Sequence, residues 1–154
     1  MRRSSWTTWQ SNLKGYEHRA ALGNFIHRMT EELFPLAILL FGSLAKGNYH
    51  TFSDADVCVI LPTPEAHPFE GYGQMASLDP TGVIQPMVYG REQFMRMISE
   101  ANGLALEVMY YGIALAGQDA FLAELEEAWQ GTRERLGLEK TATGWQITKL
   151  KEAS

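Results

Sequence analysis

The stretch from Leu40 to Ile60, LFGSLAKGNYHTFSDADVCVI, constrains the fold of this chain more than any other. Its first apolar run stops at a Gly-Ser pair, and the next run begins only after two aspartates placed one residue apart. Because side chains alternate between the faces of a strand, Asp54 and Asp56 should point the same way. Two adjacent carboxylates repel each other unless a positive charge lies between them. The stretch predicts two strands in succession, the second starting with an acidic pair.

The rest of the chain reads as helices around a small sheet. Apolar residues at helical spacing predict an amphipathic helix over 16–33, and continuous apolar runs predict strands at 36–41 and from 55 to Pro62. A helical turn is expected at 44–46, a long loop over 63–80, and a third strand at 82–89, where Pro86 indicates an edge or a bulge. Further helices are expected near 94–101, 104–112 and 121–129, and the tail after Gly137 has no clear pattern. This order predicts an α+β or α/β fold.

Composition limits the class of protein. A chain of 154 residues with 45% hydrophobic residues is expected to form one domain, 1–154, with a core at about 16–117 and a C-terminal helix and tail at 118–154. The net charge of -5 makes nucleic acid an unlikely partner. With one cysteine, Cys58, and no apolar run of membrane-spanning length, we expect a cytoplasmic protein without a membrane segment.

The same stretch contains candidate ligands for a metal and for phosphates. Carboxylate oxygens of the kind that Asp54 and Asp56 supply are preferred by Mg²⁺, although an isolated pair of this type also fits a solvated strand end. Gly42 and Ser43 follow a strand and precede a helical turn, where free backbone N–H groups and a hydroxyl bind anions. Lys46 is a candidate to add charge near a triphosphate, and it equally fits a solvent-exposed lysine.

The segment GSLAKGNYHTFSDADVCV resembles the signature of the nucleotidyltransferase superfamily that includes DNA polymerase β, in particular its small stand-alone members. The residues that match the signature position by position are Gly42, Ser43, Gly47, Ser53, Asp54 and Asp56. The segments VIQPMVYGREQFMRMI and YYGIALAG are more loosely similar to the third strand, the following helix and the closing segment of that family. The resemblance implies a small mixed β-sheet flanked by helices, with the active cleft at the ends of the strands starting near Leu36 and Asp54.

The resemblance also implies a chemistry. Asp54 and Asp56 would be the catalytic residues and would bind Mg²⁺ in a two-metal site, with Mn²⁺ as an alternative metal. Gly42 and Ser43 would hold the β- and γ-phosphates of a nucleoside triphosphate, ATP before the others, and Lys46 and Ser53 would complete the nucleotide site. A hydroxyl would attack the α-phosphate with loss of pyrophosphate.

This sequence departs from the family pattern at the third carboxylate, whose expected position is occupied by Gln85. Glutamine is neutral, so it is a weak metal ligand and cannot act as a base. Asp79, Glu70 and Glu65 in the preceding loop are candidates to replace the missing carboxylate. Leu44 also stands where the family usually has an arginine.

Two functions therefore remain open. In the first, the protein transfers a nucleoside monophosphate to a hydroxyl of a protein, such as a helical HEPN-type partner, or of a small molecule such as an aminoglycoside. In the second, the loss of the third carboxylate leaves a nucleotide-binding or partner-binding module of the antitoxin type. The histidines show no metal-ligand spacing, and Cys58 is expected to be a small core residue rather than a nucleophile.

Overall fold

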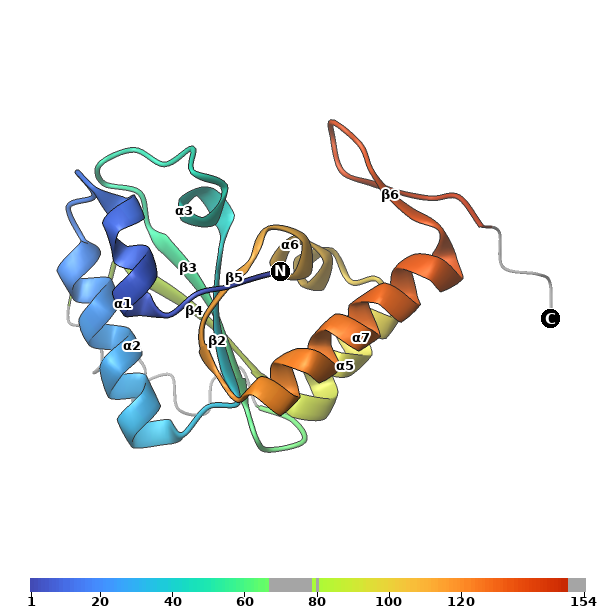
Figure 1. Ribbon diagram of the computed structural model, residues 1–154, viewed down its shortest axis with the longest axis horizontal. Coiled ribbons are helices and arrows are strands. Elements are labelled where there is room, and N and C mark those ends of the chain that lie inside the picture. The colour runs from blue at the N-terminus through green and yellow to red at the C-terminus, as the bar shows by residue number, and fades with distance from the viewer. Residues whose placement is uncertain (67–78, 80, 150–154) are drawn as a thin grey trace.

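The computed structural model describes residues 1–66, 79 and 81–149, shown in colour in Figure 1. Its strands are β1 (Arg2–Arg3), β2 (Ala37–Phe41), β3 (Ala55–Leu61), β4 (Ile84–Gly90), β5 (Ile113–Gly117), β6 (Leu138–Lys140) and β7 (Trp145–Ile147). Its helices are α1 (Trp6–Trp9), the 3₁₀ helix η1 (Gln10–Leu13), α2 (Arg19–Leu33), α3 (Gly42–Lys46), α5 (Arg91–Ser99), α6 (Gly103–Tyr111) and α7 (Asp119–Leu136).

Five strands form one mixed sheet in the order β1-β5-β2-β3-β4. β2 runs antiparallel to β3 and β5, whereas β4 is parallel to β3 and β1 is parallel to β5. The predicted fold class, a small mixed sheet flanked by helices, is confirmed. The prediction that Pro86 marks an edge is also confirmed, because β4 is the last strand of the sheet.

Helices cover both faces of the sheet (Figure 1). Ile38 and Leu40 of β2 pack with residues of α1, η1 and α2 in one core cluster, and Leu39 packs with residues of α5, α6 and α7 in the other. All five residues of β2 are buried, since their side chains alternate between two covered faces. This double burial explains why β2 reads as one uninterrupted apolar run.

The element boundaries differ from the sequence predictions in instructive places. α2 begins at Arg19 rather than at Tyr16, because Tyr16 lies in a turn and its backbone N–H donates to the carbonyl of Leu13 at 3.0 Å. The tail without a predicted pattern forms the hairpin of β6 and β7, which extends from the end of α7 (Figure 1). In the described parts of the chain, no helix is both long and apolar enough to cross a membrane.

Candidate functional site

The turn from β2 into α3 lies directly against the second aspartate. Phe41, the last residue of β2, pairs with Asp56 of β3. The next residue, Gly42, has a φ of 71°, and a Cβ atom built on it would overlap the Oδ2 atom of Asp56. Glycine adopts this left-handed conformation without strain and leaves the space that the carboxylate occupies. The start of α3 and the Asp56 carboxylate thus share one site.

The two aspartates differ in their surroundings. Asp54 is exposed and lies just before β3, while Asp56 is half-buried as the second residue of the strand. Ala55 between them is fully buried, as expected from the alternation of strand side chains. Burial, and then the charge of Asp54, raise the pKa of Asp56 above its usual value. The site therefore holds carboxylates close enough to repel, and a cation would relieve that repulsion.

Tyr16 supports the backbone that carries the aspartates. Its side chain is only 5% exposed, and its hydroxyl donates to the carbonyl of Ser53 at 2.5 Å. Burial, followed by the charges of Asp54, Asp56 and Asp79, raises the pKa of Tyr16 to about 12. The phenol therefore remains protonated and a hydrogen-bond donor at neutral pH. Sequence reasoning missed Tyr16, because it lies 37 residues from its partner and outside the motif.

Two residues predicted to bind nucleotide have partners within the protein. Ser53 is buried, and its Oγ atom accepts the backbone N–H of His50 at 2.9 Å. Lys46 ends α3, with its Nζ atom 2.5 Å from Glu107 and 4.6 Å from the ring centre of Tyr111. The resemblance did not indicate either arrangement. A contact of Ser53 or Lys46 with phosphate stays a prediction.

Gln85, which the motif register assigns to the third-carboxylate position, lies on β4 next to Asp56. Gln85 pairs with Asp56 across the parallel strands β3 and β4. It is exposed, and its Nε2 atom donates to the carbonyl of Gly82 at 3.3 Å. The neutral amide thus stands beside the acidic pair. Among the residues that the structure describes, no three acidic, histidine or cysteine side chains gather as a metal site.

Asp79, one of the proposed replacements, lies at the correct end of the sheet. It precedes β4, which runs parallel to β3, and it contributes to the raised pKa of Tyr16. Its carboxylate accepts the backbone N–H groups of Ile84 at 2.9 Å and Thr81 at 3.1 Å, together with the Thr81 hydroxyl. Asp79 therefore holds the turn that leads into β4.

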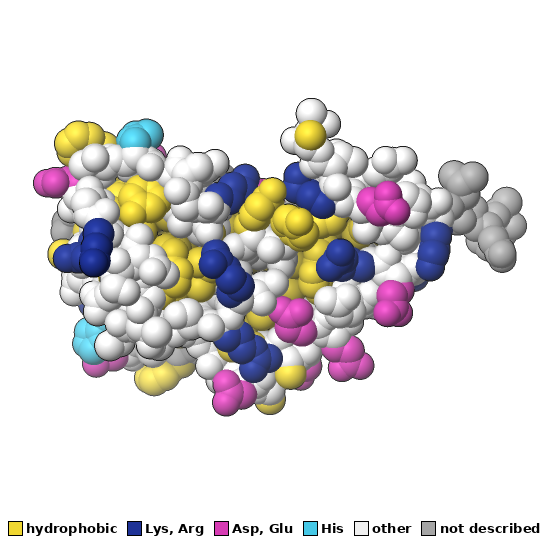
Figure 2. All heavy atoms as spheres, turned by 45° about the horizontal axis from the view of Figure 1, so that its top comes forward, with side chains coloured by type: hydrophobic (Ala, Val, Ile, Leu, Met, Phe, Trp, Pro, Cys, Tyr) yellow, Lys and Arg dark blue, Asp and Glu magenta, His cyan; other side chains and the backbone are white. Residues whose placement is uncertain are grey.

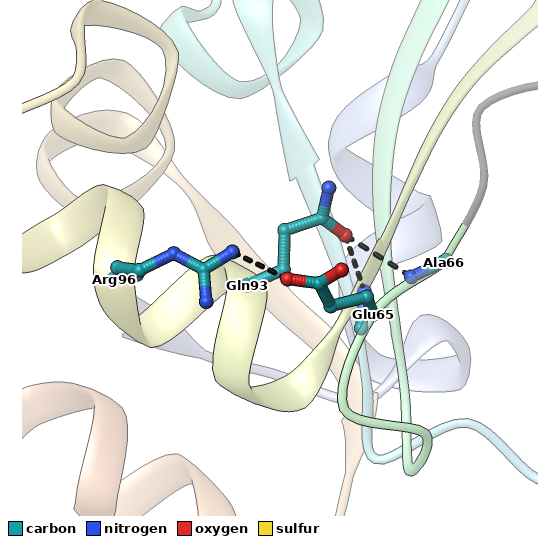
Figure 3. A network of polar contacts seen from close by, with 5 residues as sticks. Glu65, Ala66, Gln93 and Arg96 are labelled. Atoms are coloured by element: carbon teal, nitrogen blue, oxygen red, sulfur yellow. Dashed lines mark hydrogen bonds and ion pairs between the residues drawn. The ribbon is translucent and has the colours of Figure 1, made fainter.

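Glu65 lies at the other end of the sheet, since it follows the end of β3 whereas Asp54 precedes its start. Figure 3 shows its carboxylate paired with Arg96 of α5, at 2.7 Å. In the same network the Oε1 atom of Gln93 accepts the backbone N–H groups of Ala66 at 3.2 Å and Gly90 at 3.0 Å. Glu65 thus does not join the aspartates. The third candidate, Glu70, lies outside the described residues.

Cys58 and His27 lie where the sequence suggested, in the core and on a helix surface. Cys58 is fully buried in the core formed with α5, α6 and α7, and burial raises the pKa of its thiol. A protonated, buried thiol is not a nucleophile. His27 lies 3.2 Å from Glu31 one turn along the exposed side of α2. His67 lies outside the described residues.

Comparison with known proteins identifies the family. The family model described as the nucleotidyltransferase domain matches residues 25–115, which include β2, α3, β3 and β4 and the first three residues of β5. The chain belongs to the nucleotidyltransferase domain family. A comparison with curated protein sequences finds no match. A crystal structure of a toxin-antitoxin with AMP-PNP is similar at 21% sequence identity, covering 74% of this chain and 91% of that chain, with a TM-score of 0.48.

Proposed function

We propose that this protein transfers a nucleoside monophosphate from a nucleoside triphosphate, ATP before the others, to a hydroxyl group of a protein or of a small molecule. The observation that carries the proposal is the close approach of the Asp56 carboxylate to Gly42. This approach joins the acidic pair to the Gly42-Ser43 turn, which is the part of the family motif that would hold phosphates. The match to the nucleotidyltransferase domain supports the same reaction class.

The residues present fit a Mg²⁺ ion. Mg²⁺ is commonly held by one or two carboxylates, with substrate phosphates and water filling its remaining positions. Asp54 and Asp56 would be the protein ligands. Burial and then the charge of Asp54 raise the pKa of Asp56, and a cation between the two carboxylates would favour their ionised forms. When bound, the metal neutralises charge on the phosphates. Mn²⁺ has the same preference for oxygen ligands and is expected to replace it.

The protein groups would act mainly by positioning. Asp54 and Asp56 would hold the metal to which the triphosphate binds, Gly42 leaves room for the Asp56 carboxylate, and Ser43 would contact the β- and γ-phosphates. A bond forms between the acceptor oxygen and the α-phosphorus while the bond to pyrophosphate breaks, and the proton of the acceptor leaves to solvent. Gln85 cannot take that proton, because an amide is not a base.

A second candidate function is a nucleotide-binding or partner-binding module without turnover. It is favoured by the position of Gln85 opposite Asp56, and by the hydrogen bonds and the ion pair that engage Asp79 and Glu65 elsewhere. In this version the protein would bind the nucleotide and a helical protein partner, as an antitoxin does.

Transfer of label from an α-³²P-labelled nucleoside triphosphate distinguishes the two functions. The protein is incubated with Mg²⁺ or Mn²⁺ and with candidate protein and aminoglycoside acceptors. Transfer by the parent that is lost in the double variant Asp54→Asn/Asp56→Asn supports the enzyme. Transfer that begins only with Gln85→Asp, or Mg²⁺-dependent binding without any transfer, supports the binding module. If neither label transfer nor Mg²⁺-dependent nucleotide binding occurs, both functions are wrong.

A further inference from the structure

An exposed aromatic ring lies next to the aspartates. Phe52 is 66% exposed, although it is two residues from Asp54 and in the loop that leads into β3. Exposing a phenylalanine forgoes the stabilisation that its burial would bring. Figure 2 shows a hydrophobic and a histidine side chain side by side at one end of the molecule. Exposure by itself does not indicate a ligand, since Phe34 is 72% exposed and far from the site. What distinguishes Phe52 is its place two residues from Asp54.

A tight turn holds the ring in this exposed position. The backbone N–H of Ser53 donates to the carbonyl of His50 at 3.1 Å, and the N–H of Phe52 donates to the Nδ1 atom of His50 at 3.3 Å. The hydroxyl of Ser53 accepts the N–H of His50. Three hydrogen bonds thus close four residues into a turn. The turn presents Phe52 outward instead of folding it into the core.

A row of aromatic rings connects Phe52 to the interior. The ring of His18 lies 6.3 Å from that of Phe52, with a tilt of 56°, and 5.7 Å from the ring of Tyr16 in an edge-to-face contact. Tyr16 is buried and holds the carbonyl of Ser53. The Phe52 ring is therefore supported on the side facing His18, while most of its surface remains open.

The open ring lies within reach of a nucleotide in the site. Two residues of chain span at most about 7 Å between α-carbons, so Phe52 stays close to Asp54. A triphosphate held at Gly42 and Ser43, with its α-phosphate at the aspartates, would direct its nucleoside toward the rim of the site. Aromatic rings stack on every base, since each base has a π-face.

We propose that Phe52, supported by His18, is the stacking platform for the base of the nucleoside triphosphate. This inference rests on the proposed nucleotide site and adds the group that would bind the base. Stacking increases with the size of the base, so the site should prefer purines over pyrimidines. It reads no base edge, and it should therefore discriminate weakly between adenine and guanine.

Calorimetric titrations of the full chain with Mg·ATP, Mg·CTP and magnesium tripolyphosphate test this proposal. Phe52→Leu keeps an apolar side chain but removes the ring, and we expect it to raise the Kd for Mg·ATP roughly tenfold. The Kd for tripolyphosphate, which has no base, should not change. Phe52→Trp should restore the affinity for Mg·ATP. The preference for ATP over CTP should shrink in Phe52→Leu.

Phe34→Ala is the matched control, because Phe34 is 72% exposed and lies at the far end of α2, before β2 begins. It should leave all three Kd values unchanged. If Phe52→Leu binds Mg·ATP as tightly as the parent, or weakens tripolyphosphate equally, the stacking proposal is wrong while the phosphate site stands. If the parent binds neither ATP nor tripolyphosphate, the proposed function fails and the base platform fails with it.

Discussion

At the scale of single residues, the site is defined by a carboxylate that is stabilised in its protonated form. The pKa of Asp56 is raised in the folded protein by burial and by Asp54. An acid with a raised folded-state pKa contributes stability below its unfolded pKa, and this contribution is lost as the pH rises through the folded-state value. The metal-free protein should therefore lose stability as the pH rises from about 4, the unfolded pKa of an aspartate.

Asp56→Asn removes this source of instability, and thermal unfolding in EDTA between pH 4 and 8 measures it. We expect the variant to melt a few degrees higher than the parent near pH 7, since about 1 kcal/mol shifts the Tm of a domain this size by roughly 2–4 °C. The difference should shrink toward pH 4, and Mg²⁺ should stabilise only the parent. The exposed residue Glu139 on β6 offers the control Glu139→Gln, which should change little. A parent Tm that rises with pH in EDTA would contradict the expectation.

At the scale of elements, the turn from β2 into α3 determines whether the Gly42-Ser43 turn can lie against the Asp56 carboxylate. Gly42→Ala introduces both a left-handed backbone strain and an overlap with Asp56. Gly47→Ala is a close control, because Gly47 has a φ of 81° but nothing within 4 Å of the added Cβ. We expect Gly47→Ala to cost about 1 kcal/mol of unfolding free energy. Gly42→Ala should cost more and should abolish Mg·ATP binding. Equal binding by the two variants would show that the approach of Asp56 to Gly42 is not needed.

The elements also show what the sequence could predict. The two-sided burial of β2 and the helical spacing of α2 are local patterns, and both elements were predicted from them. β1 has only Arg2 and Arg3, so nothing local indicates its pairing with Ile113 and Ala114. The hairpin of β6 and β7 was missed for the same reason, since strands of three residues have no visible period.

In the candidate site, too, features within the motif could be predicted from the sequence, whereas contacts between distant segments could not. The motif register assigned Gln85 to the third strand, and the structure pairs it with Asp56. The hydrogen bond from Tyr16 to Ser53 was not predicted, since it depends on the packing of two distant segments. The engagement of Lys46 by Glu107 also joins distant segments. Residues that support a site from outside its sequence motif can therefore be identified only from the structure.

At the scale of the whole molecule, the segment before α2 stabilises the loop before β3 through the hydrogen bond from Tyr16 to Ser53. Tyr16→Phe keeps the ring contacts but leaves the buried carbonyl of Ser53 without its donor, which should cost about 1–3 kcal/mol of unfolding free energy. Mg·ATP binding should weaken as well, because Asp54 follows that carbonyl. Tyr49→Phe is the control, since its exposed hydroxyl donates to Asn12 at 3.0 Å while its ring also contacts Tyr16. Denaturation in urea measures the unfolding free energy, and calorimetry measures Mg·ATP binding. Equal effects of Tyr16→Phe and Tyr49→Phe would show that the hydrogen bond from Tyr16 to Ser53 has no special role.

The pairing of β1 with β5 has a consequence for how the protein is made. Arg2 pairs with Ile113, so the start of the chain cannot join the sheet until β5 has left the ribosome. The contact between Tyr16 and Ser53 closes a far shorter loop and can form earlier in synthesis. We expect the N-terminal strand to dock late, after the rest of the sheet has paired. A nascent chain stalled before β5 would then hold the acidic pair in place while its first residues remained open to proteolysis.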